Sequence, residues 1–247
     1  MGILQNENAI PVASAGGFYD YQIEQSIRMD ADNSEHLRRT PSSAGNRQTW
    51  SFSFWAKRGT LGSFQIILEA GSSGDASTRL FHAFKSSDDG IEVSSGTVNY
   101  GASSAKLRDT SGWNHIFIKH TGGTQTIYLN GNSIKTSSIS GDTAVNSTVA
   151  HGIGCRASGT GDFYNGYMAE VILVDGTAYE PTQFAESKNG VWIPKDPSGT
   201  SFGTNGVHLK FENASDLGND SSGNNNDFTA TNMGTDHQVL DSPTFGS

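Results

Sequence analysis

Two successive strand-turn-strand patterns between residues 110 and 135 restrict most strongly what this chain can fold into. Residues 113–119 and 126–129 are rich in Trp, Ile, Phe, Thr and Tyr, and Gly122-Gly123 separates them. Such residues favour strands, and a Gly-Gly pair suits a tight turn. Asn130-Gly131 follows, and this dipeptide tolerates the positive φ angles of a type I′ turn. The sequence therefore predicts two consecutive antiparallel hairpins.

Short strands separated by Gly and Ser continue on both sides of these hairpins. In residues 50–57, large apolar side chains alternate with serines, which predicts a strand with one buried face. Strands of this length with frequent turns are typical of an all-β sandwich. Residues 37–45 read as a loop, and residues 180–186, with Pro181 in the first turn, read as the one short helix. Further strands are expected at 25–30, 64–69, 78–84, 91–93, 97–100, 148–155, 167–174 and 207–211.

The central stretch is also similar to a known family. Gly112, Trp113 and His115 precede an apolar strand and a Gly-Gly turn, and residues 128–131 read Tyr-Leu-Asn-Gly. This set resembles the laminin G-like, concanavalin A-like jelly rolls. The resemblance implies a two-sheet antiparallel jelly-roll sandwich.

Three further segments resemble virion proteins of tailed bacteriophages, in particular marine phages. The resemblance implies a virion protein that is made in the bacterial cytoplasm. The first residues contain neither the basic start nor the apolar segment of a signal peptide, which agrees with that expectation. The segments are 39–47 with 49–58, 167–170 through 175–176, and 220–224 with 241–244.

The chain divides into one domain with extensions, since β-sandwiches reach 247 residues in one unit. Residues 1–22 are expected to form an N-terminal arm, either flexible or docked through the aromatics of 18–21. Residues 23–194 form the jelly roll and 195–206 a linker. Residues 207–247 supply a C-terminal strand and tail that complete the sandwich. That strand closes its own domain or a neighbour's, and its own is favoured because closing such a linker costs little entropy.

Charge, apolar content and cysteine content argue against several classes of function. The formal net charge is −9, with 16 basic residues against 25 acidic ones, and this weighs against nucleic acid. No run of 18 apolar residues exists, so membrane insertion is not expected. Cys155 stands alone, which excludes an internal disulfide, and it is expected to be a small buried residue, not a nucleophile.

No catalytic residue is predicted. Jelly-roll glycoside hydrolases carry two glutamates flanking an aspartate on one strand, and no such triplet occurs here. Glu170 is alone on its strand and is expected to be a buried, hydrogen-bonded carboxylate that ties two strands. The seven histidines show no spacing suited to zinc, and a Ser-His-Asp set could be assembled only by free choice among many serines.

The candidate ligand-binding residues are aromatic. Trp55 breaks the alternation of its strand, and it either packs under a loop on the outer face, which is favoured, or stacks on a sugar. Tyr100 and Tyr164 are expected in exposed loops, where they would favour receptor binding. No cofactor is predicted, because the oxygen-bearing residues that could hold Ca²⁺ read better as Asx-turns. Those weak calcium candidates are Asp30, Asp32, Asn33, Asp216, Asp220 and Asn224.

Three functions compete at this point. The first is a non-enzymatic virion surface protein, a tail-fibre or spike adhesin that binds a host glycan or receptor. The alternative is capsid decoration or cement, or a head-fibre protein, with other virion subunits as partners. A glycoside hydrolase on the same fold lacks its carboxylates. A homo-oligomer such as a trimer suits either of the first two functions.

Overall fold

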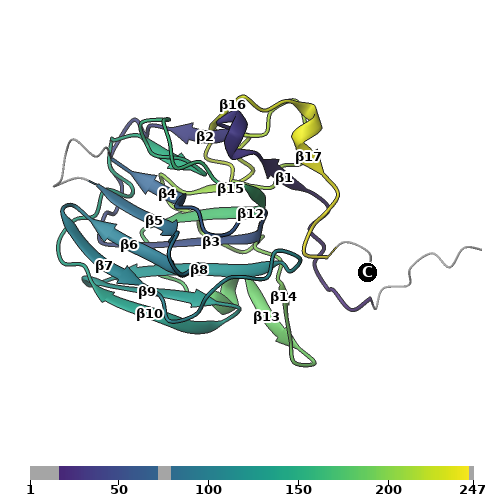
Figure 1. Cartoon of the computed structure of the whole chain (residues 1–247), viewed down its shortest axis with the longest axis horizontal. Coiled ribbons are helices and arrows are strands. Elements are labelled where there is room, and N and C mark those ends of the chain that lie inside the picture. The colour runs from purple at the N-terminus through teal and green to yellow at the C-terminus, as the bar shows by residue number, and fades with distance from the viewer. Residues whose placement is uncertain (1–16, 72–78, 245–247) are drawn as a thin grey trace, which may run out of the picture.

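The computed structural model describes residues 17–71 and 79–244. Most of the expected arm, residues 1–16, lies outside this part, as does residue 78 of the expected strand 78–84. The described chain is an antiparallel sandwich of two large sheets with three short 3-10 turns (Figure 1). The predicted all-β, two-sheet antiparallel fold is therefore confirmed.

The described strands form two large sheets and one hairpin. Within residues 17–71 and 79–244, no helix is long and apolar enough to cross a membrane. Sheet A contains, in spatial order, β10 (Asn132–Ser138), β9 (Thr124–Leu129), β8 (Asn114–Thr121), β3 (Thr49–Arg58), β12 (Gly166–Asp175), β1 (Ser26–Met29) and β17 (Gln238–Val239), with β15 (Val207–Leu209) also paired to β12. Sheet B contains β16 (Thr229–Thr231), β2 (His36–Arg39), β11 (His151–Ile153), β4 (Gln65–Ala70), β5 (Leu80–Phe84), β6 (Ile91–Ser95) and β7 (Val98–Ala102). The hairpin is β13 (Ala185–Lys188) with β14 (Val191–Pro194), and the 3-10 turns are η1 (Ala31–Asn33), η2 (Pro181–Gln183) and η3 (Thr235–His237).

The main core lies between sheets A and B. Trp50, Phe52 and Phe54 of β3 are at most 1% exposed and pack there, on the face that the sequence predicts. Leu80 and Phe84 of β5 meet them from the opposite sheet. Burying such large side chains is worth about 1.5–3 kcal/mol each, so this face dominates the stability of the domain.

The outer face of sheet A is buried as well. Trp55 of β3 and Ala169 of β12 pack against Ala185 and Trp192 of the β13–β14 hairpin. Figure 1 shows this hairpin projecting from the lower side of the sandwich. Strand β12 consequently has apolar contacts on both faces.

Two local predictions are wrong. The helix expected at 180–186 is only the 3-10 turn η2, because Ala185–Lys188 pairs with Val191–Pro194 as a hairpin. The loop expected at 37–45 begins instead inside strand β2, which pairs with β11 on one side and β16 on the other. In both cases the pairing partner lies too far along the chain for local propensity to reveal it.

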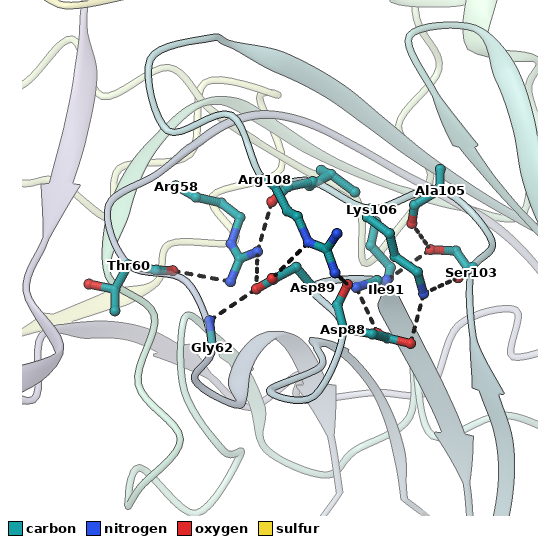
Figure 2. Close-up of polar contacts among 12 residues, drawn as sticks. Arg58, Thr60, Gly62, Asp88, Asp89, Ile91, Ser103, Ala105, Lys106 and Arg108 are labelled. Carbon is teal, nitrogen blue, oxygen red and sulfur yellow. Dashed lines mark hydrogen bonds and ion pairs between the residues drawn. The ribbon is translucent and has the colours of Figure 1, made fainter.

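A buried ion pair fastens one end of the sandwich (Figure 2). Arg58 at the end of β3 donates to Oδ1 of Asp89 over 3.0 Å and to the carbonyl of Leu107 over 2.8 Å. Its guanidinium also lies 4.4 Å from the ring centre of Phe84. The backbone amide of Gly62 and then the Arg58 charge hold the pKa of Asp89 below its ordinary value. This contact joins β3 to the β5–β6 turn.

Candidate functional site

A break in the strand beside β12 creates the candidate site. Strand β1 pairs with residues 166–168 of β12, and β15 pairs with residues 171–173 along the same edge. Between them, the register of β12 against β3 shifts between Ala169 and Ile172. Glu170 occupies this bulge with a φ angle of 48°. A left-handed glutamate is strained, and bulges and strained residues concentrate at functional sites.

The Glu170 side chain is buried and held at both oxygens. The hydroxyl of Tyr21 donates to Oε1 over 3.0 Å, and Nε2 of His208 lies 2.7 Å from Oε2. The His208 ring in turn stacks on Phe202, with 5.8 Å between ring centres. Because His208 belongs to β15, the predicted role of Glu170 as a buried carboxylate that ties two strands is confirmed.

Tyr21 comes from the segment before β1 and completes this group. Its pKa is raised far above the ordinary value, chiefly by burial and then by the charge of Glu170, with smaller contributions from Asp196 and Glu212. The phenol therefore stays protonated, and it remains a hydrogen-bond donor to Glu170 at any ordinary pH.

Two adjoining clefts open beside this group. One, of about 340 Å³, is lined among others by Tyr21, Phe202 and Lys210. The other, of about 280 Å³, is lined by Tyr21, Glu170 and Lys210 among others. They adjoin at Tyr21 and Lys210, and each lies near the lower end of the range of about 300–1,000 Å³ usual for ligand sites. We call them the paired cleft, with Tyr21, Glu170, Asp196, Phe202, His208 and Lys210 as its principal residues.

The rim of the paired cleft is polar. Oδ1 of Asp196 accepts from the amide of Ser198 over 2.9 Å, and the ammonium of Lys210 lies 4.0 Å from Glu212. Aromatic walls with acceptors and donors at the rim suit a ligand with both C–H faces and hydroxyl groups. Because burial raises the pKa of Tyr21, its phenol is not an activated nucleophile.

The described chain contains one Ser-His contact that resembles a nucleophile and its base. Oγ of Ser53 lies 2.9 Å from Nε2 of His115, but Nδ1 of this ring accepts the indole N–H of Trp192 over 3.1 Å. Burial lowers the pKa of His115 to about 3, so the neutral ring must carry its proton on Nε2. It cannot take a proton from Ser53. Cys155 is fully buried with the pKa of its thiol raised to about 12, which confirms its expected inert role.

The three predicted ligand-binding aromatics lie in separate surroundings. The expectation that Tyr164 is exposed is wrong, because it is fully buried and its hydroxyl donates to the carbonyl of Lys57 over 3.0 Å. Trp55 is 4% exposed and stacks on His115 beneath the hairpin, as the packing alternative expects. The expectation that Tyr100 lies in an exposed loop is also wrong, because it is half-buried on edge strand β7 and packs against the main core.

Four of the weak calcium candidates, Asp30, Asn33, Asp220 and Asn224, make side-chain hydrogen bonds. Oδ1 of Asp30 accepts from the amide of Asp32, and Oδ2 accepts from the side chain of Asn33. The carboxylate of Asp220 accepts from backbone amides on both sides of its turn, and Asn224 donates to the carbonyl of Gly206 over 3.0 Å. Asp216 lies on the wall of a separate hollow. Within residues 17–71 and 79–244, no group of three or more His, Cys, Asp or Glu side chains is arranged to hold a metal ion.

The sequence alone identifies Glu170 as a buried carboxylate but does not identify its partners. His208 lies in β15 and Lys210 directly follows it, and Tyr21 ends the aromatic run 18–21. The local signals are Glu170 among the apolar residues of β12 and His208 between the two apolar residues of β15. Their meeting depends on the bulge in β12, which no local pattern encodes.

Comparisons with known proteins agree with this architecture. Residues 32–183 match the profile of a family described as the concanavalin A-like lectin/glucanases superfamily. A search of proteins with curated descriptions finds no match. The chain is similar to a candidate carbohydrate-binding protein from Bacteroides ovatus, with a TM-score of 0.52 and 16% identity over 86% of this chain and 61% of that one. It therefore spans about three fifths of that protein's length.

Two further solved structures are less similar. They are a SAP-like pentraxin from Limulus polyphemus, with a TM-score of 0.47 and 15% identity over 66% of this chain and 81% of that one, and domains LG4-5 of the mouse laminin alpha1 chain, with a TM-score of 0.46 and 11% identity over 73% and 46%.

Proposed function

The chain belongs to the concanavalin A-like lectin/glucanases superfamily, and we propose that it is a non-catalytic protein that binds glycans in the paired cleft. One observation carries the proposal. The hydrogen-bonded Tyr21–Glu170–His208 group lies at the junction of two clefts, with the aromatic side chains of Tyr21 and Phe202 in their lining. Such a site offers stacking surfaces and fixed hydrogen-bonding groups without an activated nucleophile.

The internal chemistry supports binding over turnover. A glycosidase needs a carboxylic acid that can protonate the leaving group and a second carboxylate placed to act as nucleophile or base. Both oxygens of Glu170 are already engaged by Tyr21 and His208. The carboxylates at the rim are solvent-exposed, and such groups lack the burial that raises the pKa of a catalytic acid.

We propose a biological setting from the resemblance of three segments to virion proteins. We place the protein on the surface of a tailed-bacteriophage virion, as a tail-fibre or spike adhesin that binds a host-cell glycan or receptor. Its partners are then that glycan and other virion proteins, and a homo-oligomer such as a trimer would multiply weak single-site affinity.

A glycan array probed with the full chain tests this function. Tyr21→Ala and Phe202→Ala should each weaken binding at least about tenfold, since stacking aromatics dominate such contacts. Tyr19→Ala is the matched control, because Tyr19 contacts Phe18 and does not line the cleft. Absence of binding to any glycan, or hydrolysis of one by the purified chain, would count against the proposal.

The second candidate is capsid decoration, cement or a head-fibre role. It is favoured by apolar side chains at the two ends of the described chain, where Phe18 is 38% and Leu240 is 67% exposed. These end segments lie together, since the amide of Ile23 donates to Oγ1 of Thr244 over 2.9 Å. Labelling of intact particles with antibodies against this chain separates the roles, because decoration places the label on the head and adhesion on the tail.

A further inference from the structure

We propose that the paired cleft prefers saccharides that carry a free amino group and disfavours those that carry carboxylate, sulfate or phosphate groups. This preference rests on the proposed function and specifies its ligand class. It follows from how charges are distributed around the cleft, and three observations support it.

The first observation is the excess of carboxylates. Glu24, Glu170 and Glu212 line one half of the paired cleft, and Asp196 lies in the other. Among the described residues that line either half, Lys210 is the only lysine or arginine, and it lies 4.0 Å from Glu212. This excess of negative charge therefore repels an incoming anion and attracts an ammonium group.

The second observation is that three of these carboxylates accept hydrogen bonds that hold them in place. Asp196 accepts the amide of Ser198, and Oε1 of Glu212 accepts the hydroxyl of Ser221 over 3.1 Å. Glu170 is fixed from both sides. Acceptors that are already ordered lose little entropy when a ligand ammonium binds between them.

The third observation concerns the position where the two halves meet. The charges of Glu170, Asp196 and Glu212 all stabilise the neutral form of the Tyr21 phenol, so the potential at its hydroxyl is negative. Tyr21 lines both halves, so a saccharide that fills the cleft contacts this residue. A sugar amine is thus attracted at the centre of the site as well as at its rim.

The test compares matched oligosaccharides of glucosamine, N-acetylglucosamine and glucuronic acid on an array that also carries neutral glycans. The full chain is used slightly below neutral pH, where the amine is charged. We expect the amino form to bind at least about tenfold more tightly than its acetylated counterpart and the anionic form to bind most weakly. Added salt should reduce the difference, because it screens exposed charges.

Variants distinguish the cleft from the general negative charge of the protein. Asp196→Asn combined with Glu212→Gln should reduce the preference for the amine about tenfold while leaving the fold intact, since both changes keep the side-chain shape. Asp32→Asn is the control for net charge, because Asp32 is exposed in η1 and lines neither half of the cleft.

The possible outcomes separate the two proposals. If no glycan binds, the proposed function itself fails. If neutral, acetylated or anionic glycans bind as tightly as amino forms or more tightly, glycan binding stands and the amine preference is overturned. A preference that survives Asp196→Asn with Glu212→Gln also overturns it, because the attraction then lies outside the paired cleft.

Discussion

The hydroxyl of Tyr21 donates a 3.0 Å hydrogen bond to Oε1 of Glu170, which lies 149 residues further along the chain. The contact brings the segment before β1 onto the bulge of β12. It satisfies one oxygen of a carboxylate that is only 7% exposed. The candidate site therefore cannot form from the jelly-roll strands alone.

Tyr21→Phe removes this hydrogen bond and keeps the ring. We expect the free energy of unfolding to fall by about 1–3 kcal/mol, because a buried carboxylate loses a donor. Urea denaturation measures the change, and glycan affinity should fall with it. Tyr19→Phe should have little effect, since the described contact of Tyr19 is its ring against Phe18. Equal stability of the two variants would contradict the assigned contact.

The pair Glu170–His208 should behave as a coupled unit. A double-mutant cycle with Glu170→Gln and His208→Gln is expected to give an interaction energy of about 0.5–3 kcal/mol in denaturation experiments. The exposed pair Lys119–Glu180 offers the comparison, and its coupling should lie below about 1 kcal/mol. Additive effects at Glu170 and His208 would mean that their 2.7 Å contact contributes nothing to stability.

Gly131→Ala tests the close packing of the Asn-Gly turn against Trp192. A Cβ at Gly131 would come within 2.7 Å of the Trp192 ring, and its φ angle is 79°. Gly122→Ala has a φ angle of 56° but meets nothing within 4 Å, so it carries the backbone strain alone. We expect both to destabilise the fold, with Gly131→Ala costing at least about 1 kcal/mol more. A similar loss of stability in both would show that the hairpin yields to the added methyl.

The sequence predicts the parts of this fold that local patterns encode. The strand expected at 50–57 is β3, and the double hairpin around Gly122 and Asn130 is β8, β9 and β10. Local patterns do not encode the bulge at Glu170, across which Ala169 and Ile172 lie on the outer face whereas Met168 and Val171 lie in the core. An inserted residue in a ladder reverses every side chain beyond it.

Less of the candidate site could be predicted from the sequence, for a related reason. Glu170 could be recognised as a buried carboxylate, since it lies alone in an apolar strand. Its partners Tyr21 and His208 come from segments that meet only where β1 and β15 share one edge of β12. A tyrosine in a glycine-rich stretch is usually expected in an exposed loop. Tyr164 is instead buried, because the chain folds back and packs it against β3.

Acid should destabilise the protein through its buried histidines. Burial depresses the folded-state pKa of each below the ordinary 6.5, so the unfolded chain binds more protons between the two values. The contribution of the neutral histidines to the free energy of unfolding is fully present above about pH 6.5. It is lost as the pH falls toward 4, by up to about 1.4 kcal/mol per pH unit for each histidine. Unfolding in urea across this range measures the slope. The histidines are His82, His120 and His151, with pKa values of about 4, and His115, at about 3.

His120→Phe separates burial from hydrogen bonding in this effect. Neither ring nitrogen of His120 has a hydrogen-bond partner among the described residues, and the ring stacks on Trp50 with 5.3 Å between centres. The variant should be as stable as the original near pH 7 or up to about 1 kcal/mol more stable, with a shallower slope in acid. His151→Phe should flatten the slope but destabilise, because the amide of Asn146 loses its acceptor. An unchanged slope in His120→Phe would contradict its assignment as a titrating group.

Truncation after Pro194 tests whether strand β15 closes its own sandwich. In the described chain, Val207 and Leu209 of β15 are fully buried and pair with the edge of β12, and Phe211 beyond them is 2% exposed. Removing them uncovers the core and leaves an unpaired edge on the central strand of sheet A, which favours association through that edge. The truncated chain should be insoluble, and adding residues 195–244 as a separate peptide during refolding should restore folded protein. A chain that ends at Thr244 is the control and should denature like the full chain. A soluble truncated product with a cooperative unfolding transition would show that β15 is an addition to a sandwich that is already complete.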